Sequence, residues 1–165
     1  GGTVPKEYIN AGKAGVQEDM LNGIIAGYNV IDIHVDILDG SSHDVDSNEN
    51  AFKMAAIFAV KDALKKAKCV MLEPIMAVEA MTPEAYQGDI MGDLNRRRGK
   101  LGAIDSRNNQ SIVKAEVPLS EMFGYSTTIR TLSSGRASYS MQPSHFEQVP
   151  QNIVEQIVEQ RTGKK

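Results

Sequence analysis

The order in which strand and helix patterns alternate from residue 70 to residue 142 limits the fold of this chain more than any other feature. Apolar residues recur with the period of a strand in some segments and with the period of a helix in others. In chain order the expected elements are a strand at 70–81, a helix striped by Tyr86, Ile90 and Leu94, strands at 100–105 and 111–117 around the polar turn SRNNQ, a helix striped by Tyr125, Ile129 and Leu132, and a strand at 136–142. This β-α-β-β-α-β order predicts a ferredoxin-like sandwich of two helices on a four-stranded antiparallel sheet.

Local signals predict where some of these elements begin and end. Thr82, Pro83 and Glu84 together predict a helix start, with threonine as the N-cap and proline in the first turn. Pro118 and Pro143 are expected at strand ends, where a missing N–H does little harm. After them, residues 150–160 predict a final helix with one apolar side.

Two glycines, Gly88 and Gly92, lie four residues apart in the helix that follows Thr82. They leave one face of that helix without side chains, and each costs about 1 kcal/mol of helix stability relative to alanine. We expect this face to pack closely on the sheet; the alternative is that the backbone of a partner approaches it.

The first 68 residues predict a helix, a strand and a second helix. Residues 5–21 have helical spacing, and VIDIHVDILD at 30–39 alternates between an apolar and a polar face. Asp46 is the expected N-cap of the following alanine-rich helix, with Glu49 as its capping-box partner.

A lone strand cannot satisfy its own backbone, so this first unit looks incomplete, as in a fragment that lacks upstream strands. The sequence therefore predicts an α+β chain of two small units. An incomplete α-β-α unit at 1–68 precedes the ferredoxin-like unit at 69–165, which includes the final helix. The unpaired strand edge makes dimerisation plausible.

Composition narrows the class of protein. The 165 residues are 41% hydrophobic with a net charge of −3, and no apolar run approaches the roughly 20 residues that cross a bilayer. We expect a soluble cytoplasmic protein without membrane contact. The single cysteine, Cys69, lies in an apolar run and is expected to pack in the core.

Every arginine lies in the second part of the chain, and three of them are consecutive: Arg96, Arg97 and Arg98. The planar guanidinium group suits phosphate, so a local RNA contact is one interpretation. The other is a solvated run at a helix end, which the helix dipole favours.

The loop GSSHDVDSNEN at 40–50 invites a test for metal binding. With Asp44 at position 1 of a calcium loop, position 6 is Glu49 where glycine is required, and position 12 is Ala55 where glutamate is required. We therefore expect no metal here. The sequence also lacks a nucleophile elbow and a phosphate-binding loop, so we expect no catalytic centre in this chain.

Longer segments carry a more specific signal. EPIMAVEAMTPEAYQGDIMGDLNRRRG and VPLSEMFGYSTTIRTLSSGRASYSM resemble the last domain of bacterial elongation factor G, and GGTVPKEYI and IDIHVDILDGSSHDVDSNENAFKMAA resemble the domain before it. The resemblance implies the second half of domain IV followed by domain V of a translational GTPase. GTP and Mg²⁺ would bind in a domain outside this chain, so no cofactor is expected here.

The resemblance also implies partners and sites. The expected partners are the ribosome, at the small-subunit decoding centre and the large-subunit GTPase-associated region, with tRNA and mRNA. His43 matches the tip histidine of the family, so Ser41, Ser42, His43 and Asp44 are the expected contacts to tRNA or rRNA. The run 96–98 matches a family motif and is a second, weaker candidate. QPSHF at 142–146 departs from the family pattern.

Two alternatives stay open. The chain could come from a ribosomal protection protein or from the back-translocating relative, which share these domains. It could also be a stand-alone RNA-binding module, although the strands at 100–105 and 111–117 show no aromatic pair for base stacking.

Overall fold

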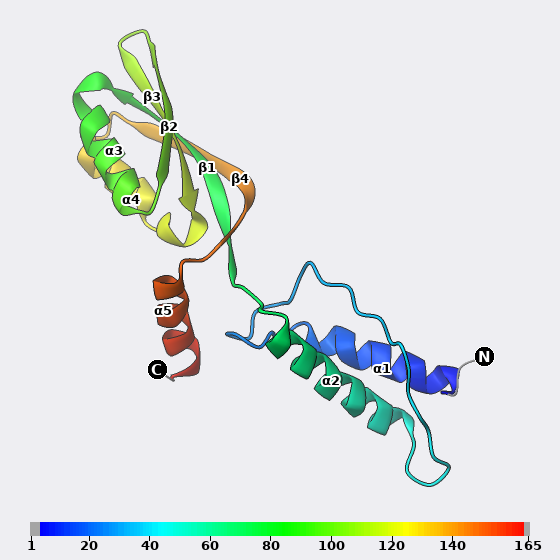
Figure 1. The fold of residues 1–165 in the computed structure, drawn as a ribbon. Helices are drawn as coiled ribbons and strands as arrows, with labels where there is room; N and C mark the ends of the chain where they lie inside the picture. Colours follow the sequence, from blue (N-terminus) through cyan, green and yellow to red (C-terminus); the bar gives the residue numbers. More distant parts are fainter. Residues whose placement is uncertain (1–3, 164–165) are drawn as a thin grey trace. The chain divides into compact units, whose positions relative to one another are not determined.

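The computed structural model describes residues 4–163 (Figure 1). These residues form two compact units, one of 4–71 with 150–163 and the other of 72–149. No helix in the described part of the chain is both long enough and apolar enough to span a membrane.

Two helices, α1 (Lys6–Asp19) and α2 (Glu49–Lys66), form the body of the first unit and confirm the two helices predicted there (Figure 1). They approach closely at Gly15, where an added Cβ would lie 2.9 Å from the backbone oxygen of Lys53. Glycine at this position therefore lets the two helix backbones meet.

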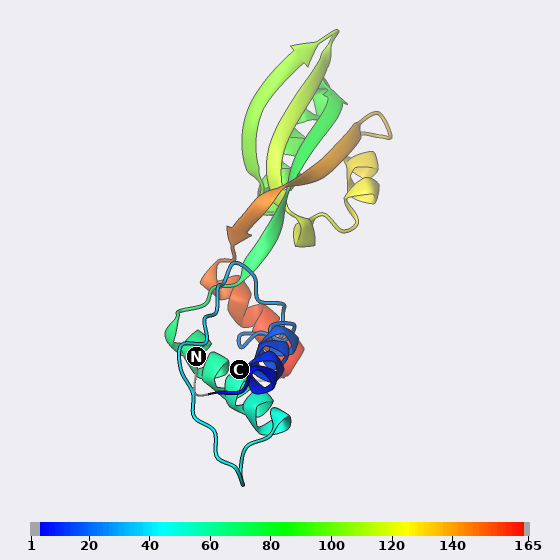
Figure 2. The same cartoon turned by 90° about the vertical axis from the view of Figure 1, so that its right-hand side faces the viewer.

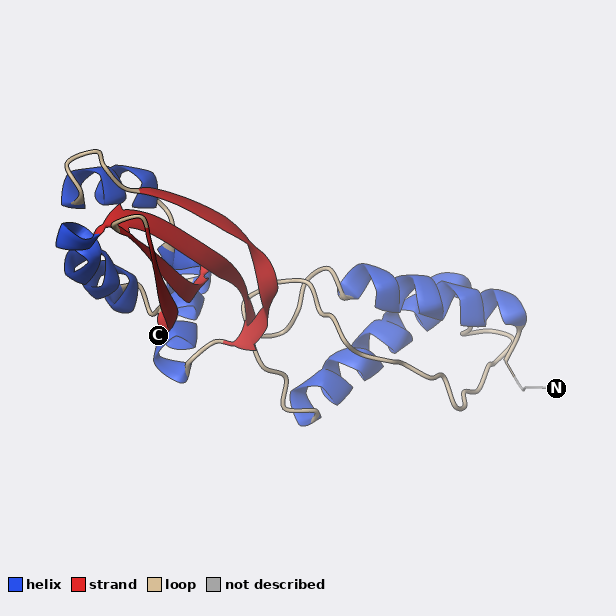
Figure 3. Cartoon of the chain, turned by 90° about the horizontal axis from the view of Figure 1, so that it is seen from above, coloured by secondary structure: helices blue, strands red, loops and turns tan. Residues whose placement is uncertain are grey.

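The strand predicted at 30–39 is wrong. Figure 3 draws this segment as loop, because none of the described residues pairs with it as a neighbouring strand. Its backbone is further interrupted at Asp32, whose φ is +57°. Ile33, Val35 and Ile37 remain 43–46% exposed. The alternation is present, but a strand needs a hydrogen-bonded partner as well as a pattern.

The N-cap predicted at Asp46 is also wrong. Asn48 caps α2, and its side-chain oxygen accepts a hydrogen bond from the Ala51 N–H at 2.8 Å. Asp46 lies in the turn before the helix, where the chain is still closing a loop between His43 and Ser47. Figure 2 shows that this loop extends beyond the N-terminal end of α2.

The final helix, α5 (Gln151–Thr162), confirms the helix predicted over 150–160. The structure groups it with the first unit, whereas the sequence division after residue 68 counts it with the second. Within the first unit, the Arg161 guanidinium lies 4.1 Å from the centre of the Tyr28 ring, a cation–π contact.

The second unit confirms the predicted ferredoxin-like fold and the α+β class. Its strands pair antiparallel in the order β2-β3-β1-β4, and both helices cover one face of the sheet (Figures 1 and 3). In chain order the elements are β1 (Leu72–Pro83), the 3₁₀ turn η1 (Glu84–Tyr86), α3 (Gln87–Arg96), β2 (Lys100–Arg107), β3 (Gln110–Pro118), η2 (Leu119–Glu121), α4 (Tyr125–Leu132) and β4 (Ser138–Gln148).

The core of the second unit lies between the two helices and the inner face of the sheet. Of the predicted helical stripes, Ile90, Leu94 and Tyr125 are 0% exposed and Ile129 is 2% exposed. Tyr86 and Leu132, at the ends of the stripes, are half-buried. The hairpin turn is shorter than predicted: β2 and β3 are joined by Asn108 and Asn109 alone. Their φ values of 50° and 62° suit asparagine in a type I′ turn.

Thr82 does not cap a helix, contrary to the prediction. β1 continues through Pro83, and Thr82 is buried in the strand opposite Ser111. The turn η1 then separates the strand from α3. Ladder pairing with β3 therefore displaces the helix start by about one turn.

Pro143 lies inside β4 and not at its end, which corrects the second proline prediction; Pro118 ends β3 as predicted. β4 is an edge strand, where a missing donor does not interrupt a ladder on both sides. The pairing with β1 shifts register beside this proline, because Met76 pairs with Pro143 and Ile75 with His145. Ser144 is thus the extra residue of a β-bulge.

Gly88 and Gly92 do not face the sheet closely, so the expected reason for these glycines is wrong. An added Cβ at either position would have no heavy atom within 4 Å among the described residues. The alternative, that a partner backbone approaches this face of α3, stays a prediction.

Candidate nucleic-acid interface

The loop before α2 is closed by short-range hydrogen bonds. The His43 N–H donates to Ser47 Oγ at 2.7 Å, and the Ser47 N–H donates to the His43 carbonyl at 3.1 Å. The Tyr8 hydroxyl donates to the Ser47 carbonyl at 3.3 Å, and the Tyr8 ring stacks on Phe52 of α2 with centroids 4.8 Å apart. Both helices of the first unit therefore fix the base of this loop.

The predicted contact residues lie together on this loop. Ser41, His43 and Asp44 are exposed, and Ser42 is half-buried. Val45 lies on the same loop but is not among the predicted contacts, and its side chain is 92% exposed. An apolar residue inside a run of polar loop residues is the only sequence signal that points to it.

The chemistry of this loop favours contacts to bases and ribose over contacts to phosphate. Asp44 and Asp46 lie on the same loop as His43, and their negative charges would repel a phosphate group. An imidazole can stack on a base or hydrogen bond to a ribose hydroxyl. Val45 adds an apolar surface for the edge of a base.

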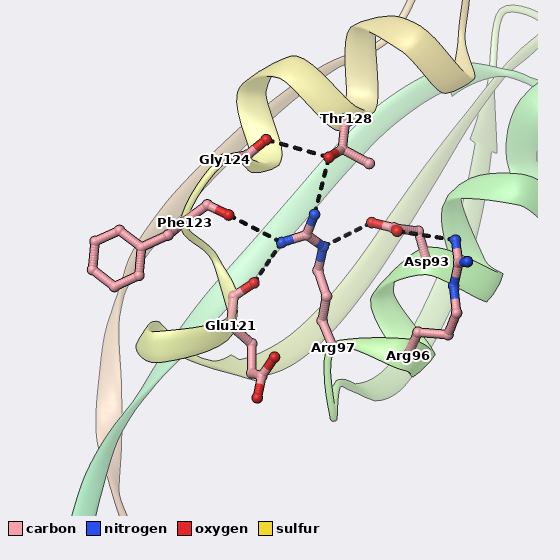
Figure 4. Close-up of polar contacts among 7 residues, drawn as sticks. All are labelled: Asp93, Arg96, Arg97, Glu121, Phe123, Gly124 and Thr128. Carbon is pink, nitrogen blue, oxygen red and sulfur yellow. Dashed lines mark hydrogen bonds and ion pairs between the residues drawn. The ribbon is translucent and has the colours of Figure 1, made fainter. Parts of the chain in front are cut away.

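The Arg97 side chain is hydrogen-bonded to other residues of the second unit (Figure 4). Its Nε donates to Asp93 at 2.8 Å, and its terminal nitrogens donate to the carbonyls of Glu121 and Phe123 and to Thr128 Oγ1. The side chains of Arg97 and Asp93 are 17% and 9% exposed. The guanidinium therefore joins the end of α3 to the start of α4.

The backbone of Arg98 is left-handed, with a φ of +58°, so its side chain points away from that of Arg97. The Gly99 N–H then bonds to the Leu94 carbonyl at 2.9 Å and the Arg98 N–H to the Asn95 carbonyl at 3.2 Å, which is a Schellman motif. The Arg98 side chain makes a two-pronged pair with Glu73, both contacts at 2.8 Å. This pair raises the pKa of Arg98 above its ordinary value.

Arg96 is the member of the run that points outward. Its side chain is 74% exposed and makes an ion pair with Asp93 at 3.1 Å (Figure 4). An exposed pair of this kind contributes at most about 1 kcal/mol, so it leaves the guanidinium able to exchange partners. The RNA contact predicted for 96–98 stays a prediction, and the geometry favours Arg96 for it.

Tyr125 lies under Arg97, whose guanidinium carbon is 5.0 Å from the ring centre. The ring is 0% exposed, and its hydroxyl has no hydrogen-bond partner among the described residues. Burial, followed by the nearby Asp93 charge, raises the pKa of Tyr125 from 10.0 to about 12.

Comparison with known proteins gives matches over both units. A family model described as elongation factor G, domain IV, matches residues 1–68, and one described as elongation factor G C-terminus matches residues 70–157. A crystal structure of a protein from Thermus thermophilus is similar to this chain with a TM-score of 0.83 and 34% sequence identity. That similarity covers 100% of this chain and 25% of the Thermus chain.

We expect Arg97→Ala to lower the free energy of opening of the second unit by about 3 kcal/mol, because it leaves the buried Asp93 carboxylate without its main partner. Arg96→Ala is the matched control and should cost less than about 1 kcal/mol. Hydrogen exchange of the β1 and β3 amides measures both values. Equal effects of the two substitutions would contradict the assigned roles.

The raised pKa of Tyr125 predicts a loss of stability at high pH. The unfolded chain ionises this phenol near pH 10.0 and the folded chain near pH 12, so stability falls as the pH rises between these values. An ultraviolet titration should show a tyrosine ionising near pH 12, and Tyr125→Phe should remove that step. Persistence of the step in the variant would refute the assignment.

Proposed function

Because this chain belongs to the elongation factor G family, we propose that it is the ribosome-contacting part of a factor that moves tRNA and mRNA in a GTP-dependent reaction. The observation that carries this proposal is the match of two consecutive family domains, in order, to residues 1–68 and 70–157. The chain spans 25% of the similar Thermus protein, so the reaction of the whole factor is part of the proposal.

Within this function, the loop at 41–45 is the contact to tRNA or rRNA at the decoding centre. Its support is the combination of exposed side chains with a fixed base. His43 and Val45 are exposed, while Ser47 is tied to the backbone at His43 and to Tyr8. A prearranged loop can bind RNA without first being ordered.

The second unit provides the contact to the large subunit. Arg96 is the residue whose exposure supports an rRNA contact, whereas Arg97 and Arg98 hold the helix end in place. The open space beside Gly88 and Gly92 on the same helix would admit a partner backbone closely.

In this proposal, GTP is bound and hydrolysed by parts of the factor outside this chain. The 165 residues contain neither a GxxxxGK[ST] nor a GxGxxG pattern, which are the loops that cradle phosphates. We therefore assign GTP and Mg²⁺ binding to parts of the factor outside this chain. The binding of this chain to ribosomes should accordingly not depend on added GTP.

The test is co-sedimentation of the chain with small ribosomal subunits. His43→Ala should weaken binding by about tenfold, on the scale of about 1–3 kcal/mol for one stacked base. His34→Ala is the matched control, because His34 is also an exposed histidine and lies outside the loop. Equal binding by the two variants would sink the role of His43, and no binding by the unchanged chain would sink the proposed function.

The unpaired 33–37 segment supports a further proposal for the chain in isolation, namely pairing with a second copy. If two copies align antiparallel about Val35, each His34 faces an Asp36 and each Ile33 faces an Ile37. A single register therefore pairs opposite charges with each other and apolar side chains with each other. The segment also lines an apolar groove of about 1070 Å³ with α1 and α2, so the first unit does not fully cover its apolar side chains.

Sedimentation equilibrium decides this point. Val35→Lys would place two lysines opposite each other and should convert a dimer to a monomer. Leu38→Lys is the control, because Leu38 is 92% exposed and lies outside the paired segment. A wild-type chain that stays monomeric at high micromolar concentration, or equal loss in both variants, would contradict the pairing.

A further inference from the structure

Three potential metal ligands meet on the face of the sheet opposite α3 and α4. They are Glu116 of β3 and His145 and Glu147 of β4, and their ligand atoms all lie within 4.8 Å of one another. They are the one such group among residues 4–163. No sequence pattern pointed to it, because β3 and β4 are separated in the sheet by β1.

Strand pairing places the three side chains on one face. Glu116 lies opposite Ala77 of β1, and His145 lies opposite Ile75. Alternate residues of β1 point to the same side of the sheet, and directly paired residues share a side. Ala77 is small, so it leaves space for side chains from both flanking strands to meet above β1.

The β-bulge at Ser144 is what brings His145 to this face. Gln142 pairs with Ala77 and Pro143 with Met76, so regular pairing would place Ser144 opposite Ile75 and turn His145 to the other side. The extra residue reverses that order and aims the imidazole toward Glu116. The bulge lies in the QPSHF segment, which the family resemblance does not explain.

The imidazole is already oriented for a ligand at Nε2. Its Nδ1 lies 2.8 Å from Ser144 Oγ, and its Nε2 lies 2.7 Å from Glu147 Oε1. With a metal at Nε2, the Nδ1–H would donate to the serine hydroxyl, which would serve as the outer hydrogen-bond partner that a metal-bound histidine usually has.

One imidazole nitrogen and two carboxylate oxygens match the donors that Zn²⁺ takes, with water in the fourth position. Calcium and magnesium prefer oxygen donors alone. Glu73, which pairs with Glu147 across the strands, is not available as a ligand because Arg98 holds it. We propose that Glu116, His145 and Glu147 form a zinc site that joins β3 to the edge strand β4 across the sheet.

Substitution of Lys100 provides a further test of the zinc site. Lys100 lies opposite Glu116 in the β2–β3 ladder, and its charge also acts on Glu147. The Lys100 ammonium group therefore offsets part of the negative charge of Glu116 and Glu147 that would attract a metal ion. Removing it should strengthen zinc binding, whereas an adventitious contact at His145 alone would not respond to it.

The experiment is calorimetric titration of the chain with ZnCl₂ in a non-chelating buffer. We expect one zinc ion per chain, at least a tenfold loss of affinity in His145→Ala and Glu116→Gln, and a gain in Lys100→Gln. His34→Ala is the matched control, because His34 also contacts a carboxylate, Asp36 at 3.0 Å, but belongs to no group of three ligands among the described residues.

Thermal unfolding without metal checks that each variant folds. If His145→Ala does not fold, Co²⁺ added to the unchanged chain supplies a second measurement, because a four-coordinate site gives intense visible absorption. The proposal is overturned if the unchanged chain binds no zinc, if His34→Ala weakens binding as much as His145→Ala, or if bound Co²⁺ has the weak spectrum of an octahedral aqua ion.

Discussion

The buried ion pair of Arg97 with Asp93 is the interaction on which the helical side of the second unit depends. It joins the end of α3 to Glu121 and to the first turn of α4 through a single guanidinium group. Both partners are largely excluded from water, so removing either one would leave the other charge buried and unpaired. The positions of both helices on the sheet are therefore coupled through one side chain.

The same helix end explains why three consecutive arginines have three different environments. Arg98 adopts a left-handed conformation, and the chain can continue past it only through a glycine, because an added Cβ at Gly99 would collide with the Leu94 carbonyl oxygen. Arg96 and Arg97 are successive residues at the helix end, so they point in different directions, outward and inward. The reversal at Arg98 then directs its own side chain toward Glu73. A charge run in a sequence carries no information about such a reversal, so sequence reasoning could not separate the three.

The sequence predicted a strand correctly where the neighbouring strand that pairs with it also lies among the described residues. All four strands of the ferredoxin-like sheet find partners within residues 72–148, so period and order sufficed for its topology. The 30–39 segment alternates just as clearly but has no partner strand among the described residues. At finer scale, Asp46, Ser47 and Asn48 can all cap a helix, and the closure of the loop at His43 selected Asn48.

The loop at 40–47 was assigned by resemblance, and the hydrogen bonds that close it between His43 and Ser47 were found only from the structure. Ordering a backbone residue costs about 1–2 kcal/mol, so a flexible loop would lose several kcal/mol on binding RNA. Here the hydrogen bonds between His43 and Ser47, with Tyr8 beneath them, have already ordered the backbone. If this loop makes the proposed RNA contact, its ordering cost is met in folding, and the contacts made by His43 and Val45 would lose less free energy to ordering.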